Sequence, residues 1–162
     1  MRVEQGLAQY NLRVIVSGSA SLDPNAEIFS QHFSPIIILT TDRASKRKVQ
    51  QLSRVADEVK SFGANELDFV KAFCWLREKW AVKRLLCEGG GELNEALFHH
   101  DLVDEIYLTF CPLVFGGRDA PTMADGRGVE NLTDATRLRL KSLKRVGDEL
   151  FLVYRVKKSF LQ

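Results

Sequence analysis

Three consecutive glycines join an apolar segment to a helical pattern, and this unit constrains the fold more than any other part of the sequence. The segment KRLLCE, from Lys83 to Glu88, is typical of a strand and leads directly into Gly89 to Gly91. The next residues, ELNEALFHH over 92–100, repeat apolar side chains at helical spacing. A strand that turns at once into a helix is the repeating unit of α/β folds.

The chain before this unit shows the same alternation. Three segments predict strands: LRVIV from Leu12 to Val16, PIIILTT from Pro35 to Thr41, and EVKSF from Glu58 to Phe62. The second run has no polar alternation, which is typical of a strand covered on both faces. Helical spacing predicts helices over 42–56 and 66–80, with Asp42 and Asn65 as their capping residues.

The chain after this unit predicts antiparallel strands. A strand is expected over 104–111, followed by a long glycine-containing loop over 112–131, and loops of that length are usually functional or mobile. Segments 137–146 and 149–156 flank Gly147-Asp148, which suits a type II′ hairpin. We therefore expect one α/β domain over 1–162: a mostly parallel sheet flanked by helices, with an antiparallel C-terminal hairpin.

The composition of the sequence argues against nucleic acids and membranes as binding partners. The 162 residues fit one domain, and 45% hydrophobic with 27% charged residues is a globular composition. A formal charge of +2 indicates no polyanionic partner, so nucleic acid is not expected. No apolar run approaches the length of about 20 residues that spans a membrane, and the start has no secretory pattern. We expect a soluble, cytoplasmic protein.

Cysteine and histidine spacing does not predict a metal site. The cysteines are Cys74, Cys87 and Cys111, and they form no CxxC pair. The histidines are His32, His99 and His100, and no HExxH pattern or zinc-ligand spacing is present. We expect structural thiols, no metal, and His99 and His100 at a helix C-terminus.

Three predicted strand ends carry groups that could meet a ligand. Glycines between a strand and a helix let a phosphate approach the backbone and the helix start, although a plain tight turn is an equal alternative. Glu88 stands at the last strand position, where open α/β sheets bind ligands; alternatively its carboxylate accepts amide hydrogen bonds from the helix. Ser17-Gly18-Ser19 and Thr40-Thr41 also follow strands, with turn chemistry as the alternative. The residues alone indicate a phosphate-bearing ligand in an α/β domain.

One long segment carries a family resemblance. LLCEGGGELNEALFHHDLVDEIYLTFCPLVFGGR, from Leu85 to Arg118, closely resembles the reductase domain of bacterial riboflavin biosynthesis, a family with a dihydrofolate-reductase-like fold. The earlier LRVIVSGSASLDPNAEIF, followed by PIIILTT, is similar to that family's second segment. The resemblance thus spans nearly the whole chain.

The resemblance implies NADPH-dependent reduction of a pyrimidine ribosylamine 5′-phosphate of the 5-amino-6-(5-phosphoribosylamino)uracil type. Hydride would reach C1′ of the opened ribose and leave a ribityl chain. Glu88 would contact the substrate, and Arg43 and the serines could meet a 2′-phosphate. The cofactor would be contacted by Gly90, Gly91, Glu92, Leu93, Asn94, Ser17, Gly18, Ser19, Thr40 and Thr41. Family members are generally dimers, so a homodimer is expected.

One departure from the family pattern lies upstream. Family members begin with a strand and an LDGK-like motif that contribute to the ribose-phosphate pocket, and that segment is absent here. The deaminase domain often fused to the reductase is absent as well. We therefore expect this chain as given to be catalytically weak or inactive. The alternative function is a non-catalytic nucleotide-binding or interaction module on the same fold.

Overall fold

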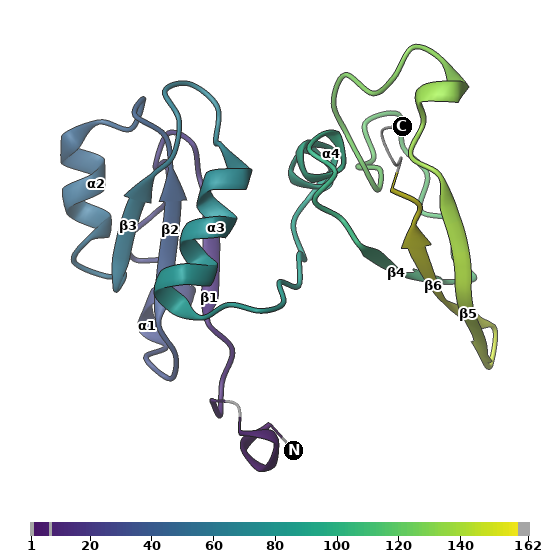
Figure 1. Cartoon of the computed structure of the whole chain (residues 1–162), viewed down its shortest axis with the longest axis horizontal. Helices are drawn as coiled ribbons and strands as arrows, with labels where there is room; N and C mark the ends of the chain where they lie inside the picture. Colours follow the sequence, from purple (N-terminus) through teal and green to yellow (C-terminus); the bar gives the residue numbers. More distant parts are fainter. Residues whose placement is uncertain (1, 7, 159–162) are drawn as a thin grey trace. The chain divides into compact units, whose positions relative to one another are not determined.

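A computed structural model describes residues 2–6 and 8–158. The chain forms two compact units, Met1–Lys83 and Arg84–Gln162, and each is described by itself. Figure 1 shows the first unit with strands β1 to β3 and the second with strands β4 to β6.

The first unit is built on a three-stranded parallel sheet of order β1-β2-β3. The strands are β1 (Arg13–Val16), β2 (Ile36–Thr40) and β3 (Glu58–Ser61). In the register, Val14 lies opposite Ile37 and Ile37 opposite Glu58. Every residue of the central strand β2 is buried, as its uninterrupted apolar run predicts for a strand covered on both faces.

Short helices and loops cover this sheet. A 3-10 turn, η1 (Val3–Gln5), precedes the sheet, and the helices are α1 (Glu27–Ser30), α2 (Lys46–Leu52) and α3 (Phe69–Trp80). Phe29 of α1 and Leu52 of α2 form one buried cluster with Ile36 and Ile38, which share a face of β2. Helix α3, drawn in front of β1 and β2 in Figure 1, buries its own apolar stripe, including Leu76.

Both predicted capping residues in this unit are wrong. Helix α2 begins after Ser45, whose hydroxyl accepts a hydrogen bond from Lys48 N, and Asp42 instead accepts one from Ser61 Oγ at 2.7 Å. Helix α3 begins after Asp68, whose carboxylate accepts from a backbone N–H of the first turn, and not at Asn65. A polar residue caps only where the backbone turns into the helix, and both turns fall later than the spacing indicated.

The second unit holds helix α4 and an antiparallel sheet of order β4-β6-β5. The elements are α4 (Gly91–His99), β4 (Glu105–Phe110), a 3-10 turn η2 (Leu132–Asp134), β5 (Leu138–Val146) and β6 (Glu149–Val156). Val146 pairs with Glu149 around a two-residue loop, and Gly147 has φ +61°, which the predicted type II′ turn requires. His99 and His100 end the helix as predicted.

The α/β class, the parallel ladders and the C-terminal hairpin are confirmed, with the parallel and antiparallel strands in separate sheets. The strand predicted from Lys83 to Glu88 is wrong: within the described ranges, the structure has no strand between α3 and α4. The boundary between the two units falls in this segment. An apolar pattern favours extended backbone, but a strand also needs a neighbour for its hydrogen-bond ladder.

Candidate functional site

The candidate residues form two groups, one in each unit. The strand-end group lies at the ends of β1 and β2 and consists of Ser17, Gly18, Ser19, Thr40, which is the last residue of β2, and Thr41. The glycine segment consists of residues 88–94 and leads into α4. Each group is described within its own unit.

In the strand-end group, the carbonyl oxygen of Gly18 is the common acceptor. It accepts from Thr41 Oγ1 at 2.7 Å, from Thr40 Oγ1 at 3.0 Å and from the backbone N–H of Thr41 at 3.1 Å. Both threonines are only 1% exposed. Since their hydroxyls are buried and bonded to this carbonyl, they hold the loop after β1 against the end of β2.

Hydroxyl and basic groups surround the same loop on its exposed side. Ser19 Oγ lies 2.9 Å from Ser21 Oγ, and Lys48 Nζ donates to Ser21 Oγ at 2.8 Å. A Cβ placed on Gly18 would lie 3.6 Å from a terminal nitrogen of Arg43. Two cations and two hydroxyls beside one loop are groups that hydrogen-bond a phosphate.

In the glycine segment, the helix start is backbone only. Helix α4 begins at Gly91 with Gly90 as its N-cap, and among the described residues no side chain accepts a hydrogen bond as its cap. The first amides of a helix have no partner within the helix, and together with its dipole they attract negative charge. Glu88, the first residue of this segment, is exposed.

The three glycines have different surroundings. A Cβ on Gly89 would lie 2.5 Å from Leu93 Cδ2, so a side chain of this helix occupies that space. A Cβ on Gly91 would lie 2.1 Å from a carboxylate oxygen of Asp125. A Cβ on Gly90 would meet nothing within 4 Å in the described part of the chain. Of the three, Gly90 is therefore the glycine that a ligand can approach most closely.

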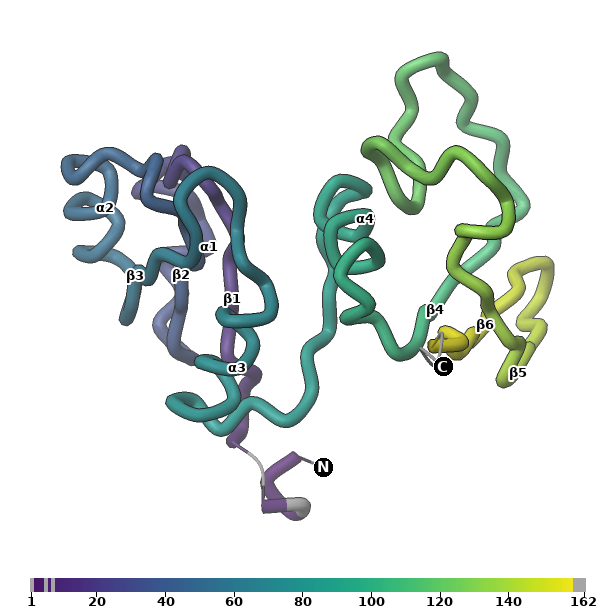
Figure 2. Tube along the Cα trace, turned by 45° about the horizontal axis from the view of Figure 1, so that its top comes forward, coloured from purple at the N-terminus to yellow at the C-terminus, as the bar shows by residue number. Residues whose placement is uncertain are grey.

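The long loop after β4 reaches the glycine segment, which sequence reasoning did not foresee. Asn94 Nδ2 donates to the carbonyl oxygen of Met123 at 2.9 Å, and Cys87 Sγ lies 3.4 Å from Asn94 Oδ1. In Figure 2, the loop leaves β4, arches away and returns to the side of α4. The only signal for this contact in the sequence is the length and glycine content of the loop over 112–131.

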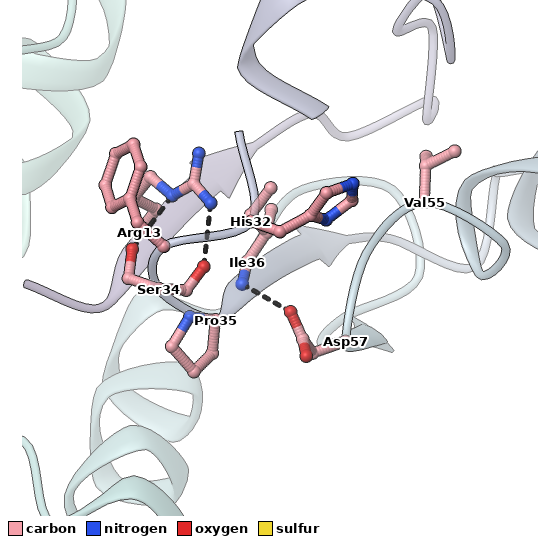
Figure 3. A pocket seen from close by; sticks show the side chains of 8 residues that line it. Arg13, His32, Ser34, Pro35, Ile36, Val55 and Asp57 are labelled. Atoms are coloured by element: carbon pink, nitrogen blue, oxygen red, sulfur yellow. Dashed lines mark hydrogen bonds between the residues drawn. The ribbon is translucent and has the colours of Figure 1, made fainter. Parts of the chain in front are cut away.

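A pocket lies at the opposite end of the parallel sheet, where β1 and β2 begin (Figure 3). Arg13 lines it but is held by protein atoms: it donates to Ser34 Oγ at 3.0 Å, to the Ile28 carbonyl at 2.8 Å and to the Gln31 carbonyl. Asp57 accepts from the backbone N–H of Ile36 at 2.8 Å. These polar groups secure the end of α1 and the start of β2, which is a structural role.

The described residues form neither a metal-binding cluster nor a membrane-spanning helix. Across residues 2–6 and 8–158, no group of three or more His, Cys, Asp or Glu side chains is arranged to hold a metal ion. No helix in the described part of the chain is both long and apolar enough to cross a membrane. The three cysteines are free and exposed.

A family model, the RibD C-terminal domain, matches residues 2–152. The chain belongs to this family. A 2,5-diamino-6-ribosylamino-4(3H)-pyrimidinone 5′-phosphate reductase from Methanothermobacter thermautotrophicus is 31% identical over 96% of the chain and 71% of the relative. A reductase of the same name from Aquifex aeolicus is 31% identical over 90% of the chain and 64% of the relative. The chain thus spans about two thirds of these relatives.

Solved structures confirm the fold class expected for the RibD C-terminal domain. A pyrimidine reductase-like protein from Corynebacterium diphtheriae superposes with a TM-score of 0.79 at 21% identity, over 98% of this chain and 66% of that chain. RibD from Acinetobacter baumannii gives a TM-score of 0.67 at 17% identity, over 90% of this chain and 37% of that one. The dihydrofolate-reductase-like fold is therefore correct.

Proposed function

We propose that this protein is an NADPH-dependent reductase of a pyrimidine ribosylamine 5′-phosphate in riboflavin biosynthesis. The observation that carries the proposal is the 31% identity, over 96% of the chain, to a 2,5-diamino-6-ribosylamino-4(3H)-pyrimidinone 5′-phosphate reductase. The substrate class is a phosphorylated ribosylamine, because the relatives' names share that compound.

The reaction converts a ribosylamine to a ribitylamine. The ribose ring opens, its ring oxygen takes a proton and becomes a hydroxyl, and the resulting C1′=N bond receives a hydride at carbon and a proton at nitrogen. A nicotinamide cofactor supplies the hydride when bound. The protein's task is to hold the substrate and cofactor in the reacting geometry and to keep water out.

The strand-end group supports binding of the phosphorylated end of NADPH. Arg43 lies beside Gly18, and Lys48 reaches the hydroxyl of Ser21. NADPH differs from NADH by one phosphate, and a dianion next to two cations is stabilised by charge-assisted hydrogen bonds. Gly18 has no side chain to obstruct the approach. Thr40 and Thr41 would support this loop from beneath, because their hydroxyls are bonded to its carbonyl.

The glycine segment supports binding of a second phosphate-bearing part. Gly90 opens to free space and the amides at the start of α4 lack a side-chain cap in the described chain. Both features suit the cofactor's pyrophosphate. Gly91, Glu92, Leu93 and Asn94 would shape the first turn behind it, and Glu88 would face the substrate.

The decisive experiment incubates the chain with NADPH and the diaminopyrimidinone ribosylamine 5′-phosphate. If the proposal holds, NADPH is consumed with formation of a product two mass units heavier than the substrate, and NADH is a poorer donor. Steady NADPH oxidation would also overturn the expectation that this chain is catalytically weak or inactive. The same assay is repeated with 5-amino-6-(5-phosphoribosylamino)uracil as the substrate. If neither pyrimidine is reduced, the proposal is wrong: calorimetric binding of NADPH without reduction would favour a non-catalytic nucleotide-binding module, and no binding would favour an interaction module on the same fold.

We propose in addition that the protein is a homodimer. Strand β4 is an edge strand of the antiparallel sheet, and its Tyr107 and Phe110 are 69% and 62% exposed. Exposed apolar side chains on an edge strand favour association with another copy. Sedimentation at micromolar concentration tests this, and a purely monomeric species contradicts it.

A further inference from the structure

We propose that Asp125 is a positioning residue for the cofactor site: it holds the turn Thr122–Gly126 on the first turn of α4 and leaves Gly90 as the point of approach for the cofactor's pyrophosphate. This inference rests on the proposed function. Nothing in the sequence pattern singles out Asp125, and its role follows from contacts within the second unit.

The Asp125 carboxylate first organises its own turn. Its Oδ1 accepts a hydrogen bond from the backbone N–H of Thr122 at 3.1 Å and from Thr122 Oγ1 at 2.5 Å. The Thr122 hydroxyl also lies 3.0 Å from the carbonyl oxygen of Ala124. An Asp carboxylate that accepts from residues near it in the chain is a common way to stabilise an irregular turn.

The turn is packed directly against the start of α4. A Cβ on Gly91 would lie 2.1 Å from Asp125 Oδ2 and 2.8 Å from its backbone nitrogen. A flexible side chain could move away, but the backbone nitrogen belongs to the turn itself. Position 91 therefore requires glycine because the loop, and not a ligand, approaches its Cα atom.

Two more contacts extend this packing along the helix. Asn94 Nδ2 donates to the Met123 carbonyl at 2.9 Å. A Cβ on Gly126, whose φ is +150°, would lie 3.0 Å from the side chain of Glu95. The turn thus lies against the first five residues of α4, at Gly91, Asn94 and Glu95.

The three glycines therefore have different roles. Leu93 closes Gly89 and Asp125 closes Gly91, whereas Gly90 has open space above its Cα atom in the described chain. Gly90 has φ −70° and ψ 177°, a conformation open to any residue. It is therefore needed for its missing side chain and not for its backbone freedom. Displacing the turn would change the surroundings of the neighbouring Gly91 at the helix start.

The first test compares Asp125→Ala, Asp125→Asn and, as a control on the same loop, the exposed Asp119→Ala. Asparagine keeps the Oδ1 acceptor and the shape. We expect Asp125→Ala to raise KM for NADPH about tenfold while kcat changes by about twofold or less, because a displaced turn weakens cofactor placement before chemistry. Asp125→Asn restores a KM near wild type, and Asp119→Ala leaves both constants unchanged.

If Asp125 only stabilised the fold, Asp125→Ala would lower the stability of the protein without selectively raising the KM for NADPH. A raised KM with a nearly unchanged kcat therefore distinguishes a positioning role from a purely structural one. Asp125→Ala with an unchanged KM overturns the inference, as does Asp125→Asn with the same defect as Asp125→Ala. If the wild-type chain neither binds nor oxidises NADPH, the proposed function fails, and the inference fails with it. If the wild type is active, failure belongs to the inference alone.

The second test compares Gly90→Ala with Gly91→Ala. We expect Gly90→Ala to leave thermal unfolding unchanged and to raise the Kd for NADPH about tenfold, because the methyl occupies the space of approach. Gly91→Ala should instead lower the unfolding temperature and increase hydrogen exchange of residues 122–126. Equal effects of the two variants on unfolding and on NADPH binding would contradict the assignment.

Discussion

The hydroxyl oxygen of Thr41 lies 2.7 Å from the carbonyl oxygen of Gly18, and this contact joins the end of β2 to the loop after β1. Thr41 follows a buried strand and Gly18 follows its parallel neighbour, so the register of the two strands brings them together. The sequence suggested that the Thr41 hydroxyl could bind a ligand. In the structure it instead supports the backbone of the loop after β1. The hydroxyls of Thr40 and Thr41 thus hold the backbone of the loop after β1.

Replacing Thr41 with valine tests this support. The variant keeps the shape of the side chain and removes the donor, and Gly18 retains its bonds to Thr40 Oγ1 and Thr41 N. We expect the free energy of unfolding to fall by about 1 kcal/mol, the usual net value of one such bond. Urea denaturation measures it. Thr109→Val, at an exposed position of β4, is the matched control because it makes the same change without removing a buried hydrogen bond, and equal losses in both variants would contradict the role of the Thr41 bond.

The cap of α3 gives a second prediction. Asp68 Oδ1 accepts from Lys71 N at 3.0 Å, and Asp68 Oδ2 pairs with Lys71 Nζ at 2.9 Å. Asp68→Ala should reduce the free energy of unfolding by about 1 kcal/mol, as for other N-caps. Asn65→Ala, at the exposed position that the spacing indicated, should change it by less than about 0.5 kcal/mol. A larger effect at Asn65 in thermal or urea unfolding would restore the earlier assignment.

Glu105 is the source of a predicted pH dependence in the antiparallel sheet. Its Oε1 accepts from Lys141 at 2.7 Å and from Arg155 at 2.9 Å, and the hydrogen bonds from Lys141 and then Arg155 lower its pKa from 4.5 to about 2. A carboxyl whose pKa is lower in the folded state stabilises the fold above its unfolded pKa, and the stabilisation disappears as the pH falls toward the folded value.

The measurement compares wild type with Glu105→Gln by chemical denaturation from pH 6 down to pH 2. We expect wild type to be the more stable at pH 6 and the difference to shrink as the pH falls from the ordinary carboxyl pKa of 4.5 to the folded value of about 2. Glu149→Gln, on β6 and outside this ion-pair cluster, is the control. A difference that stays constant across this range would show that ionisation of Glu105 does not stabilise the sheet.

The centre of the parallel sheet gives the largest expected loss of stability. Ile38 is 0% exposed and belongs to the cluster with Phe29 and Leu52. Ile38→Ala should cost about 2 to 5 kcal/mol, through lost burial and the cavity that remains. Val70→Ala on the exposed side of α3 should change stability by less than about 0.5 kcal/mol. Guanidinium titrations of both variants provide the comparison, and similar midpoints would refute the placement of the core.

Much of the fold was predictable because local patterns record burial and backbone preference. The uninterrupted apolar run of β2 predicted a strand covered on both faces, and Gly147-Asp148 predicted the hairpin turn between β5 and β6. The helix predicted after the three glycines is present and begins at Gly91, one residue earlier than the pattern placed it. These features depend on residues close together in the chain, so the sequence carries them directly.

The tertiary structure decided the features that need a distant partner. The segment from Lys83 to Glu88 has a strand-like pattern, but the described chain offers it no ladder, so the pattern alone did not make a strand. The helix caps shifted to Ser45 and Asp68, where the backbone enters each helix. The propensity of a segment depends on its own residues. Strand pairing and the point at which the backbone enters a helix depend on which other parts of the fold lie nearby.

For the candidate site, the sequence alone determined which residue types stand at the strand ends and before α4. Only the tertiary structure decided what each of them faces: Thr41 turns to Gly18, Gly91 is closed by Asp125, and Gly90 stays open. Asp125 lies far along the chain from Gly91, and no periodicity links them. Contacts between residues that are distant in sequence arise from packing, which is why the sequence indicated a phosphate site but not the loop that shapes it.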